Sequence, residues 1–231
     1  MARRVFHWLL GALLLVSFVA VLPEHQERVS KPEFKPDYVP GHDRLSGQWQ
    51  MRFASDGETP LVHAPSMVAL PDGRLRAFWF AGKREGGPDV AIHSAIFDPR
   101  RGAWSDEERI VTREQIRLQW GRHVRKLGNA VPVLDDNGRM RLFVVAVSFG
   151  GWAASRLVVL ESDDMGASWR FDEALVTSPF LNISTLVKTP PIRYQDGTVG
   201  LPVYHEMVGK FGEILRLDDH NRIVDKERIG H

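Results

Sequence analysis

Cysteine is absent from the 231 residues, which excludes disulfide bonds and thiolate metal sites. An excess of one charge is absent as well, because 30 Lys and Arg residues balance 29 Asp and Glu residues to a formal net charge of +1. We therefore predict no nucleic-acid partner, since such proteins carry a basic surface. Phosphate-binding loops, G-x-S-x-G elbows and dinucleotide fingerprints are also missing.

The N-terminus contains one long apolar run. Arg3 and Arg4 precede Val5–Leu22, and eighteen helical residues at about 1.5 Å each span roughly 27 Å, enough for a thin bilayer. We expect residues 1–23 to be a signal-anchor, with a cleaved signal peptide as the alternative. In both cases the basic residues stay inside and the remainder is exported. The protein is then membrane-anchored through residues 5–22 or secreted, outside the cytoplasm.

A polar segment with regularly spaced prolines follows, over residues 24–47. It predicts an extended linker. From residue 48 onward, apolar runs of four to eight residues alternate with Asp, Gly and Asn turns, and no long segment has a helical period. We predict an all-β fold for residues 48–231, with the first strand near Gln48–Phe53. Residues 107–120 are polar and predict a loop with at most a short helix.

One turn is more specific than the others. Ser162, Asp164, Gly166, Ser168 and Trp169 form the pattern S-x-D-x-G-x-S-W between two strand-like runs. The Asp carboxylate can accept hydrogen bonds from backbone N–H groups of the turn, and glycine adopts positive φ without strain. The Trp side chain can cover the turn. The pattern therefore predicts a structural hairpin turn.

The chain also repeats itself at an offset of 65 residues. Gly73–Ala81 matches Gly138–Ala146, and Asp98–Trp104 falls on Asp163–Trp169. A third unit begins at Pro191 and ends in a degenerate turn at residues 218–221, with Asn at the glycine position. A fixed internal repeat indicates stacked sheets of one design, and a β-sandwich would not predict it.

The turn pattern and the repeat resemble the Asp-box of sialidase-like β-propellers, the BNR-repeat family. The resemblance covers residues 48–231 and implies a six-bladed propeller. The three clear units predict three to four blades, so we expect a partial propeller whose missing blades come from a longer chain or a partner.

The resemblance implies roles for three residues of the first unit. His63 stands where the family has the first arginine of a carboxylate-binding triad, and a neutral imidazole cannot form the arginine fork. Asp89 matches the aspartate that acts as the acid/base catalyst. Arg84 lies nearby and is expected to bind an anionic sugar.

Other substrate-binding candidates follow from their places in loops that the resemblance puts on the ligand face of a propeller. They are Arg122, His123, Asn129, Lys188, His205 and Glu206. No metal-ligand spacing occurs, and no metal or cofactor is predicted. The family's nucleophilic Tyr–Glu pair and its other two arginines belong to later blades, so we expect this chain alone to lack a complete sialidase site.

The sequence thus predicts an exported glycoside hydrolase of the exo-sialidase type that acts on an anionic carbohydrate or polysaccharide. Two alternatives remain open. One is a propeller polysaccharide lyase that uses His and Tyr, and the other is a glycan-binding module without catalysis.

Overall fold

The computed structural model describes residues 5, 8–15, 32–35, 50–177, 184–207 and 209–229. The chain divides into two units, Met1–Glu33 and Phe34–His231. In the first unit, residues 8–15 are helical. No helix within the described ranges combines the length and the apolar character that a membrane span requires. The predicted span Val5–Leu22 extends beyond the described residues, so membrane anchoring stays a prediction.

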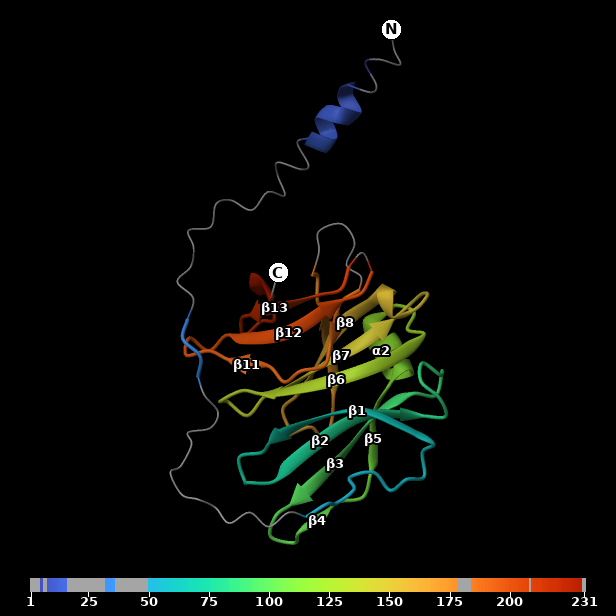
Figure 1. The fold of residues 1–231 in the computed structure, drawn as a ribbon, viewed down its shortest axis with the longest axis vertical. Coiled ribbons are helices and arrows are strands. Elements are labelled where there is room, and N and C mark those ends of the chain that lie inside the picture. The colour runs from blue at the N-terminus through green and yellow to red at the C-terminus, as the bar shows by residue number, and fades with distance from the viewer. Residues whose placement is uncertain are drawn as a thin grey trace. The chain divides into compact units, whose positions relative to one another are not determined.

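Three antiparallel sheets follow one another along the second unit (Figure 1). The first sheet contains β1 (Leu61–Ala69), β2 (Leu75–Gly82), β3 (Ala91–Asp98), β4 (Ala103–Trp104) and β5 (Glu108–Thr112). The second contains β6 (Lys126–Leu134), β7 (Met140–Val147), β8 (Ser155–Ser162) and β9 (Arg170–Ala174). The third contains β10 (Leu186–Val187), β11 (Ile192–Arg193), β12 (Val199–His205), β13 (Phe211–Leu217) and β14 (Ile223–Ile229). The all-β prediction is confirmed, and each repeat corresponds to one sheet.

The first strand begins at Leu61, so the strand predicted near Gln48–Phe53 is wrong for its described residues, 50–53. This segment lies beside the first sheet instead of pairing with it. Ala54 packs against a small apolar cluster that includes Trp79. Residues 50–53 form no strand, and the side chain of Met51 is 87% exposed.

The core lies between the sheets. Phe78 and Phe80 of β2 face Leu142 and Val144 of β7 in one cluster, while Phe143 of β7 contributes to a second cluster with the third sheet. All eight residues of β7 are buried. The second sheet is therefore covered on both faces, which explains why its sequence is a nearly continuous apolar run rather than an alternating one.

The segment predicted as a loop, residues 107–120, contains β5 and an eight-residue helix, α2 (Arg113–Trp120). Thr112 and Gln115 form a reciprocal capping box at its start, and Gly121 ends it with φ 70°. These residues satisfy amide groups that a helix end leaves unpaired. Ile116 is buried, and Trp120 stacks on Phe171 of β9 with ring centroids 5.9 Å apart. Two caps and these apolar contacts hold the helix.

The S-x-D-x-G-x-S-W turn joins β8 to β9 and is held by side-chain oxygens. Ser162 Oγ donates to Asp164 Oδ1 at 2.7 Å and accepts from Gly166 N at 2.7 Å. Asp164 Oδ1 accepts from Ser168 N at 2.9 Å. Trp169 packs edge-on against Phe78 of the first sheet, with ring centroids 5.9 Å apart. The turn therefore also contacts the neighbouring sheet.

A buried arginine connects each of the first two sheets to the turn of the next sheet. Arg76 of β2 and Arg141 of β7 lie 65 residues apart and are 3% and 2% exposed. Arg76 Nη1 donates to Met165 O at 3.0 Å. Arg141 Nη1 donates to Asp218 O at 3.2 Å and to Asn221 Oδ1 at 2.8 Å. The repeat in sequence is therefore also a repeat of inter-sheet contacts.

Candidate functional site

The inner strands of the first two sheets carry a β-bulge at the same place in the repeat. The register of β1 shifts between His63 and Ser66, and that of β6 shifts between Leu127 and Ala130. Ala64, inside the first bulge, has a left-handed φ of 53°. Bulges redirect side chains and are frequent beside functional sites. In the third sheet the inner position is divided between β10 and β11, so all three inner positions are interrupted.

A pocket of about 220 Å³ lies where these strands are interrupted. Its described lining residues are His63, Ala64, Phe80, Glu85, Asn129, Val145, Trp152, Leu186, Lys188, Tyr204 and Glu206. All three sheets contribute to it. An apolar floor with a few convergent polar groups is typical of small-molecule sites.

Four of the residues predicted from sequence line this pocket: His63, Asn129, Lys188 and Glu206. Asn129 also has a structural role, because its Nδ2 donates to Val187 O at 2.8 Å and ties the second sheet to β10. The His63 ring lies 5.3 Å from the buried ring of Phe80. The structure thus brings together residues that are up to 143 positions apart in the chain.

Asp89 and Arg84 belong to the loop between β2 and β3 and are not among the residues that line the pocket. Asp89 Oδ2 accepts from Lys83 N at 2.6 Å. This hydrogen bond to the carboxylate lowers the pKa of Asp89 below its usual value. The bond closes the loop that presents Glu85 to the pocket.

The other three candidates also lie outside the pocket lining. Arg122 is 5.9 Å from the ring centroid of Trp120, to which it makes a cation–π contact. His123 is exposed. His205 Nε2 lies 2.9 Å from Glu213 Oε2, so His205 is engaged within its own sheet. A side chain at a strand end can turn outward, and sequence position alone does not distinguish the two directions.

The other seven described lining residues were not predicted from sequence as site residues, and Glu85, Trp152 and Tyr204 are among them. Lys126 Nζ lies 3.8 Å from the Trp152 ring centroid and fixes the ring from one side. Burial raises the pKa of Tyr204, and the negative charge of Glu206 raises it further. Trp152 follows a Gly-Gly pair after an apolar strand, a loop signal that could have drawn attention to it.

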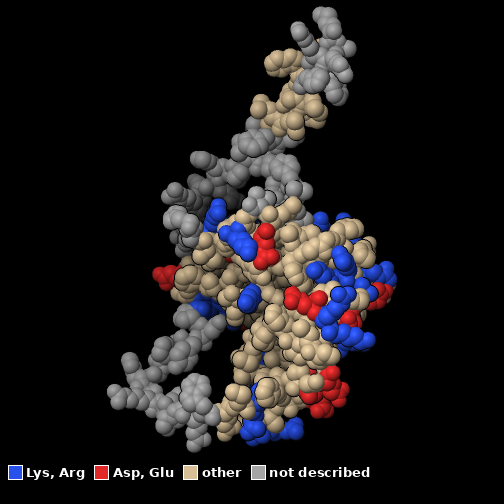
Figure 2. Space-filling model, turned by 45° about the vertical axis from the view of Figure 1, so that its right-hand side comes forward, with Lys and Arg blue, Asp and Glu red and all other residues tan. Residues whose placement is uncertain are grey.

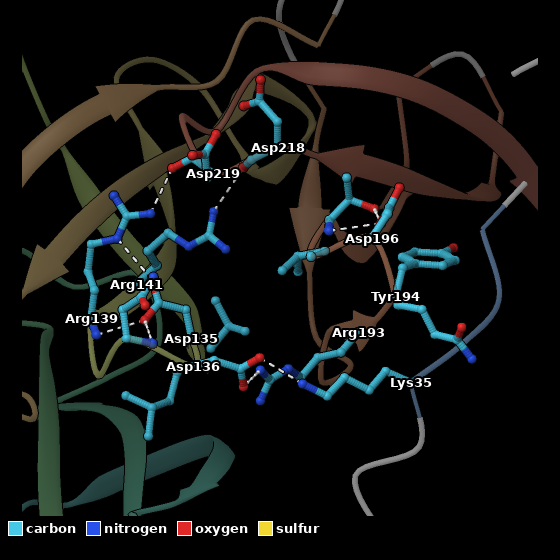
Figure 3. Close-up of a pocket in the computed structure, with 17 residues that line it drawn as sticks. Lys35, Asp135, Asp136, Arg139, Arg141, Arg193, Tyr194, Asp196, Asp218 and Asp219 are labelled. Atoms are coloured by element: carbon cyan, nitrogen blue, oxygen red, sulfur yellow. Dashed lines mark hydrogen bonds and ion pairs between the residues drawn. The ribbon is translucent and has the colours of Figure 1, made fainter.

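A larger polar pocket of about 500 Å³ lies at the opposite end of β6 (Figure 3). Its charged side chains largely neutralise one another. Asp136 binds both Lys35 and Arg193, and Arg139 Nε lies 3.2 Å from Asp135 Oδ2. We assign this pocket a structural role, because its ion pairs link the turns of the second and third sheets.

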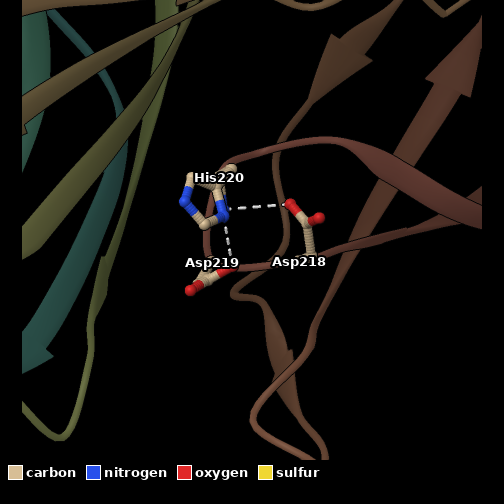
Figure 4. A group of neighbouring side chains, drawn as sticks. All are labelled: Asp218, Asp219 and His220. Atoms are coloured by element: carbon tan, nitrogen blue, oxygen red, sulfur yellow. Dashed lines mark hydrogen bonds and ion pairs between the residues drawn. The ribbon is translucent and has the colours of Figure 1, made fainter.

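Asp218, Asp219 and His220 form a small cluster beside that pocket (Figure 4). Asp218 Oδ1 accepts from His220 N at 2.9 Å and from Arg222 N at 2.8 Å. Asn221 completes the turn with φ 59°, as predicted for the degenerate turn. These hydrogen bonds within the turn explain why the three side chains lie close together.

The described surface has no face of a single charge in the view of Figure 2, where Lys and Arg side chains lie beside Asp and Glu. On α2, for example, Arg117 pairs with Glu114 at 2.5 Å. Mixed charges of this kind give no long-range attraction for ions of one sign.

Comparison with known proteins gives a family and a fold. A family model described as a BNR repeat-like domain matches residues 73–231. A search of curated proteins found no match. Solved structures that match include a Hadza microbial sialidase, with TM-score 0.58, 16% identity, and coverage of 77% of this chain and 39% of that chain.

Two further structures are similar at comparable levels. A family 117 glycoside hydrolase from Zobellia galactanivorans has TM-score 0.56 and 15% identity over 87% of this chain and 64% of that chain. The NanB sialidase from Streptococcus pneumoniae has TM-score 0.54 and 11% identity over 79% and 46%. The chain thus spans 39% to 64% of the length of these three structures. The likeness shows an all-β fold of the kind found in sialidases and glycoside hydrolases.

Proposed function

The chain belongs to the BNR repeat-like domain family, and from that premise we propose that it is an exported, glycan-active protein, a glycoside hydrolase related to sialidases. The pocket between the three sheets holds one sugar unit of an anionic glycan. Lys188 faces the carboxylate of the sugar, and the pocket carboxylates bind its hydroxyl groups. Trp152 and Phe80 supply the apolar surface against which a sugar ring packs.

The observation that carries this proposal is the convergence of polar residues from three sheets on one pocket. Four of them, His63, Asn129, Lys188 and Glu206, were selected from sequence, His63 through the family resemblance and the others by their places in loops, and all four line it. The similarity to sialidases and to a family 117 glycoside hydrolase supports a sugar as the ligand. The described lining contains no arginine. We therefore propose that further sheets, from a longer chain or a partner, complete the carboxylate site.

Glycoside hydrolysis needs a proton donor for the leaving oxygen and a second group at the sugar ring. Asp89 is the donor that the family resemblance implies, but the hydrogen bond from Lys83 N favours its ionised form. Glu206 lines the pocket directly and lies close enough to Tyr204 to affect its pKa. Glu206 and Asp89 are thus two distinct assignments for the acid, and we favour Glu206.

The test is turnover and binding with methylumbelliferyl glycosides of sialic acid, a uronic acid and galactose. We expect Glu206→Gln to lower kcat/KM for the cleaved glycoside by about 100-fold or more, the usual effect of removing a general acid. Asp89→Asn is expected to retain most activity. Arg122→Gln, outside the pocket, is the matched control. An Asp89→Asn enzyme that is inactive beside an active Glu206→Gln enzyme reverses the assignment, and absence of both binding and turnover contradicts the proposed function.

A lyase reaction is the second candidate, because His63 and Tyr204 line the same pocket. An imidazole can remove a proton next to a uronate carboxylate, and a Tyr can protonate the leaving oxygen. Elimination leaves an unsaturated sugar that absorbs ultraviolet light. Incubation with a uronate polysaccharide therefore separates the two reactions: new ultraviolet absorbance indicates elimination, and its absence with release of reducing sugar indicates hydrolysis.

We also propose export with a membrane anchor. Val5–Leu22 behind Arg3 and Arg4 supports this by its apolar character and flanking charge. Cell fractionation tests it: the full chain is expected in the membrane fraction and accessible to protease from outside, and removal of residues 1–23 is expected to leave it in the cytoplasm. Soluble full-length chain in the cytoplasm contradicts the proposal.

A further inference from the structure

Four buried hydroxyl side chains lie behind the pocket without lining it. Ser155, Thr177, Ser184 and Thr185 are 0%, 5%, 3% and 1% exposed. Ser155 Oγ donates to Thr185 O at 3.1 Å, and the Oγ1 atoms of Thr177 and Thr185 are 2.8 Å apart. Thr185 N also donates to Ser155 O at 3.4 Å. These bonds fix Thr185, the chain neighbour of Ser184, against the start of β8.

Ser184 differs from the other three because it contacts a pocket residue directly. Its Oγ accepts a hydrogen bond from the Glu206 backbone N–H at 2.7 Å. Its φ is 63°, a left-handed conformation that a non-glycine residue keeps only where the surrounding structure imposes it. Such strained residues concentrate at functional sites. In this conformation the hydroxyl oxygen of Ser184 lies at the end of β12, where it accepts the hydrogen bond from the Glu206 amide.

Glu206 needs such an anchor because it lies just past the last residue of β12, His205. The strand pairing of β12 with β13 ends at the pair His205 and Phe211, so no strand partner receives the Glu206 amide. Glu206 itself is exposed, and its carboxylate accepts no hydrogen bond among the described contacts. The hydrogen bond of its backbone amide to Ser184 is thus the described contact that fixes the position of Glu206.

We propose that Ser184 is a positioning residue, which holds the Glu206 carboxylate in the pocket through the Glu206 amide. This inference rests on the proposed function for its catalytic consequence, since Glu206 is the residue to which we assign proton donation. The buried hydroxyl cluster acts as the support: it keeps Ser184 in the conformation from which Oγ reaches the amide. Loss of the Ser184 oxygen frees the residues after β12 and lets the carboxylate leave its place beside Tyr204.

Two substitutions separate the hydroxyl from the strain. Ser184→Gly adopts positive φ freely but lacks the acceptor, and Ser184→Asn tolerates the same conformation and supplies an amide oxygen. We expect Ser184→Gly to fold and to lower kcat about 100-fold with KM near its original value, the effect of a small misplacement of a reacting group. Ser184→Asn is expected to recover most of the loss. Ser94→Ala removes another buried hydroxyl, one that is bound to Arg76 and is not among the described pocket-lining residues, and it serves as the control.

A second readout needs no substrate. NMR of isotope-labelled tyrosine, assigned with Tyr204→Phe, reports the pKa of Tyr204, which the charge of Glu206 raises. We expect this pKa to fall in Ser184→Gly and to recover in Ser184→Asn, while Ser94→Ala leaves it unchanged. An unchanged Tyr204 pKa and unchanged kcat in a folded Ser184→Gly protein overturn the inference. A shifted pKa in a protein that cleaves none of the three glycosides upholds the positioning role and refutes the proposed function instead.

Discussion

Asp164 shows how a single carboxylate stabilises a turn. It accepts hydrogen bonds from the Ser162 hydroxyl, the Ser168 amide and the Ser168 hydroxyl. These bonds lower its pKa to about 2, with the Ser168 hydroxyl as the largest cause. Gly166 is required beside it, because a Cβ there would lie 3.1 Å from Arg76 Nε in a residue with φ 90°. The turn residues are thus fixed by hydrogen bonds and by the neighbouring guanidinium.

The residue-scale prediction is pH-dependent stability. The folded pKa of Asp164 lies below its ordinary value of 3.8, so its stabilisation is present above pH 4 and is lost as the pH falls toward 2. Asp164→Asn is expected to lower the free energy of unfolding by roughly 1–2 kcal/mol at pH 7 and by much less near pH 2. Urea unfolding at both pH values measures this.

Asp163→Asn is the matched control for that experiment. Asp163 is an exposed neighbour that pairs with Arg170 on the surface, and surface pairs contribute about 0–1 kcal/mol. An equal loss of stability in the two variants at pH 7, or a loss for Asp164→Asn that does not shrink at low pH, would contradict the role of the carboxylate.

At the scale of the elements, buried arginines connect neighbouring sheets through polar contacts. Arg141 reaches from β7 to two acceptors in the turn between β13 and β14, Asp218 O and Asn221 Oδ1. Burial lowers the pKa of the Arg141 guanidinium, although it remains charged. A buried charge needs these partners, since burial of an unpaired one is costly.

We predict that Arg141→Met destabilises the protein by about 2–4 kcal/mol, because Asn221 loses a partner in a site only 2% exposed. Arg222→Met is the control, since Arg222 binds the same Asp218 turn at 2.7 Å with its side chain 76% exposed. Its effect should stay within about 1 kcal/mol. Urea midpoints measure both, and equal effects would show that the buried contact has no special role.

The sequence predicted the elements whose signals are local. The strands, the turn at Ser162–Trp169 and the repeat all follow from residue patterns within short windows. A short helix was allowed within residues 107–120, but the bounds of α2 were not predicted, although its capping box, Thr112 and Gln115, is visible in sequence. The arginine contacts could not be predicted, since they depend on which face of one sheet meets the turn of the next.

The whole molecule is most stable where a sheet is covered on both faces. β7 is buried along its entire length, whereas the last five residues of β14 are exposed and β1 alternates between partly buried and exposed. Stability is not uniform in such a stack, and outer elements open before central ones. The pocket is lined by both kinds of element, since Val145 belongs to β7 and His63 and Ala64 belong to β1.

Hydrogen exchange measured by mass spectrometry tests this order. We expect amides of β7 to exchange only through global unfolding, and those of β14 to exchange much faster. Arg141→Met should accelerate exchange in the third sheet before it affects the first. Equal protection of β7 and β14 would contradict a stack organised around the second sheet.

The sequence predicted only some of the residues that line the pocket. The family resemblance selected His63, and position in the loops selected Asn129, Lys188 and Glu206, because loops at the same end of each sheet meet. It could not tell which side chains turn inward, as His205 shows. The bulges in β1 and β6 decide that direction, and they depend on strand register rather than on composition.

The arginine contacts also give the second sheet two matching ends, a donor for the third sheet and an acceptor turn for the first. In the third sheet the position that corresponds to the donor is Gly200, and its strand partner is Arg216. A gene that copies one such segment in tandem copies both ends together. Duplication of such a segment therefore adds a sheet that already carries its polar contacts to both neighbours.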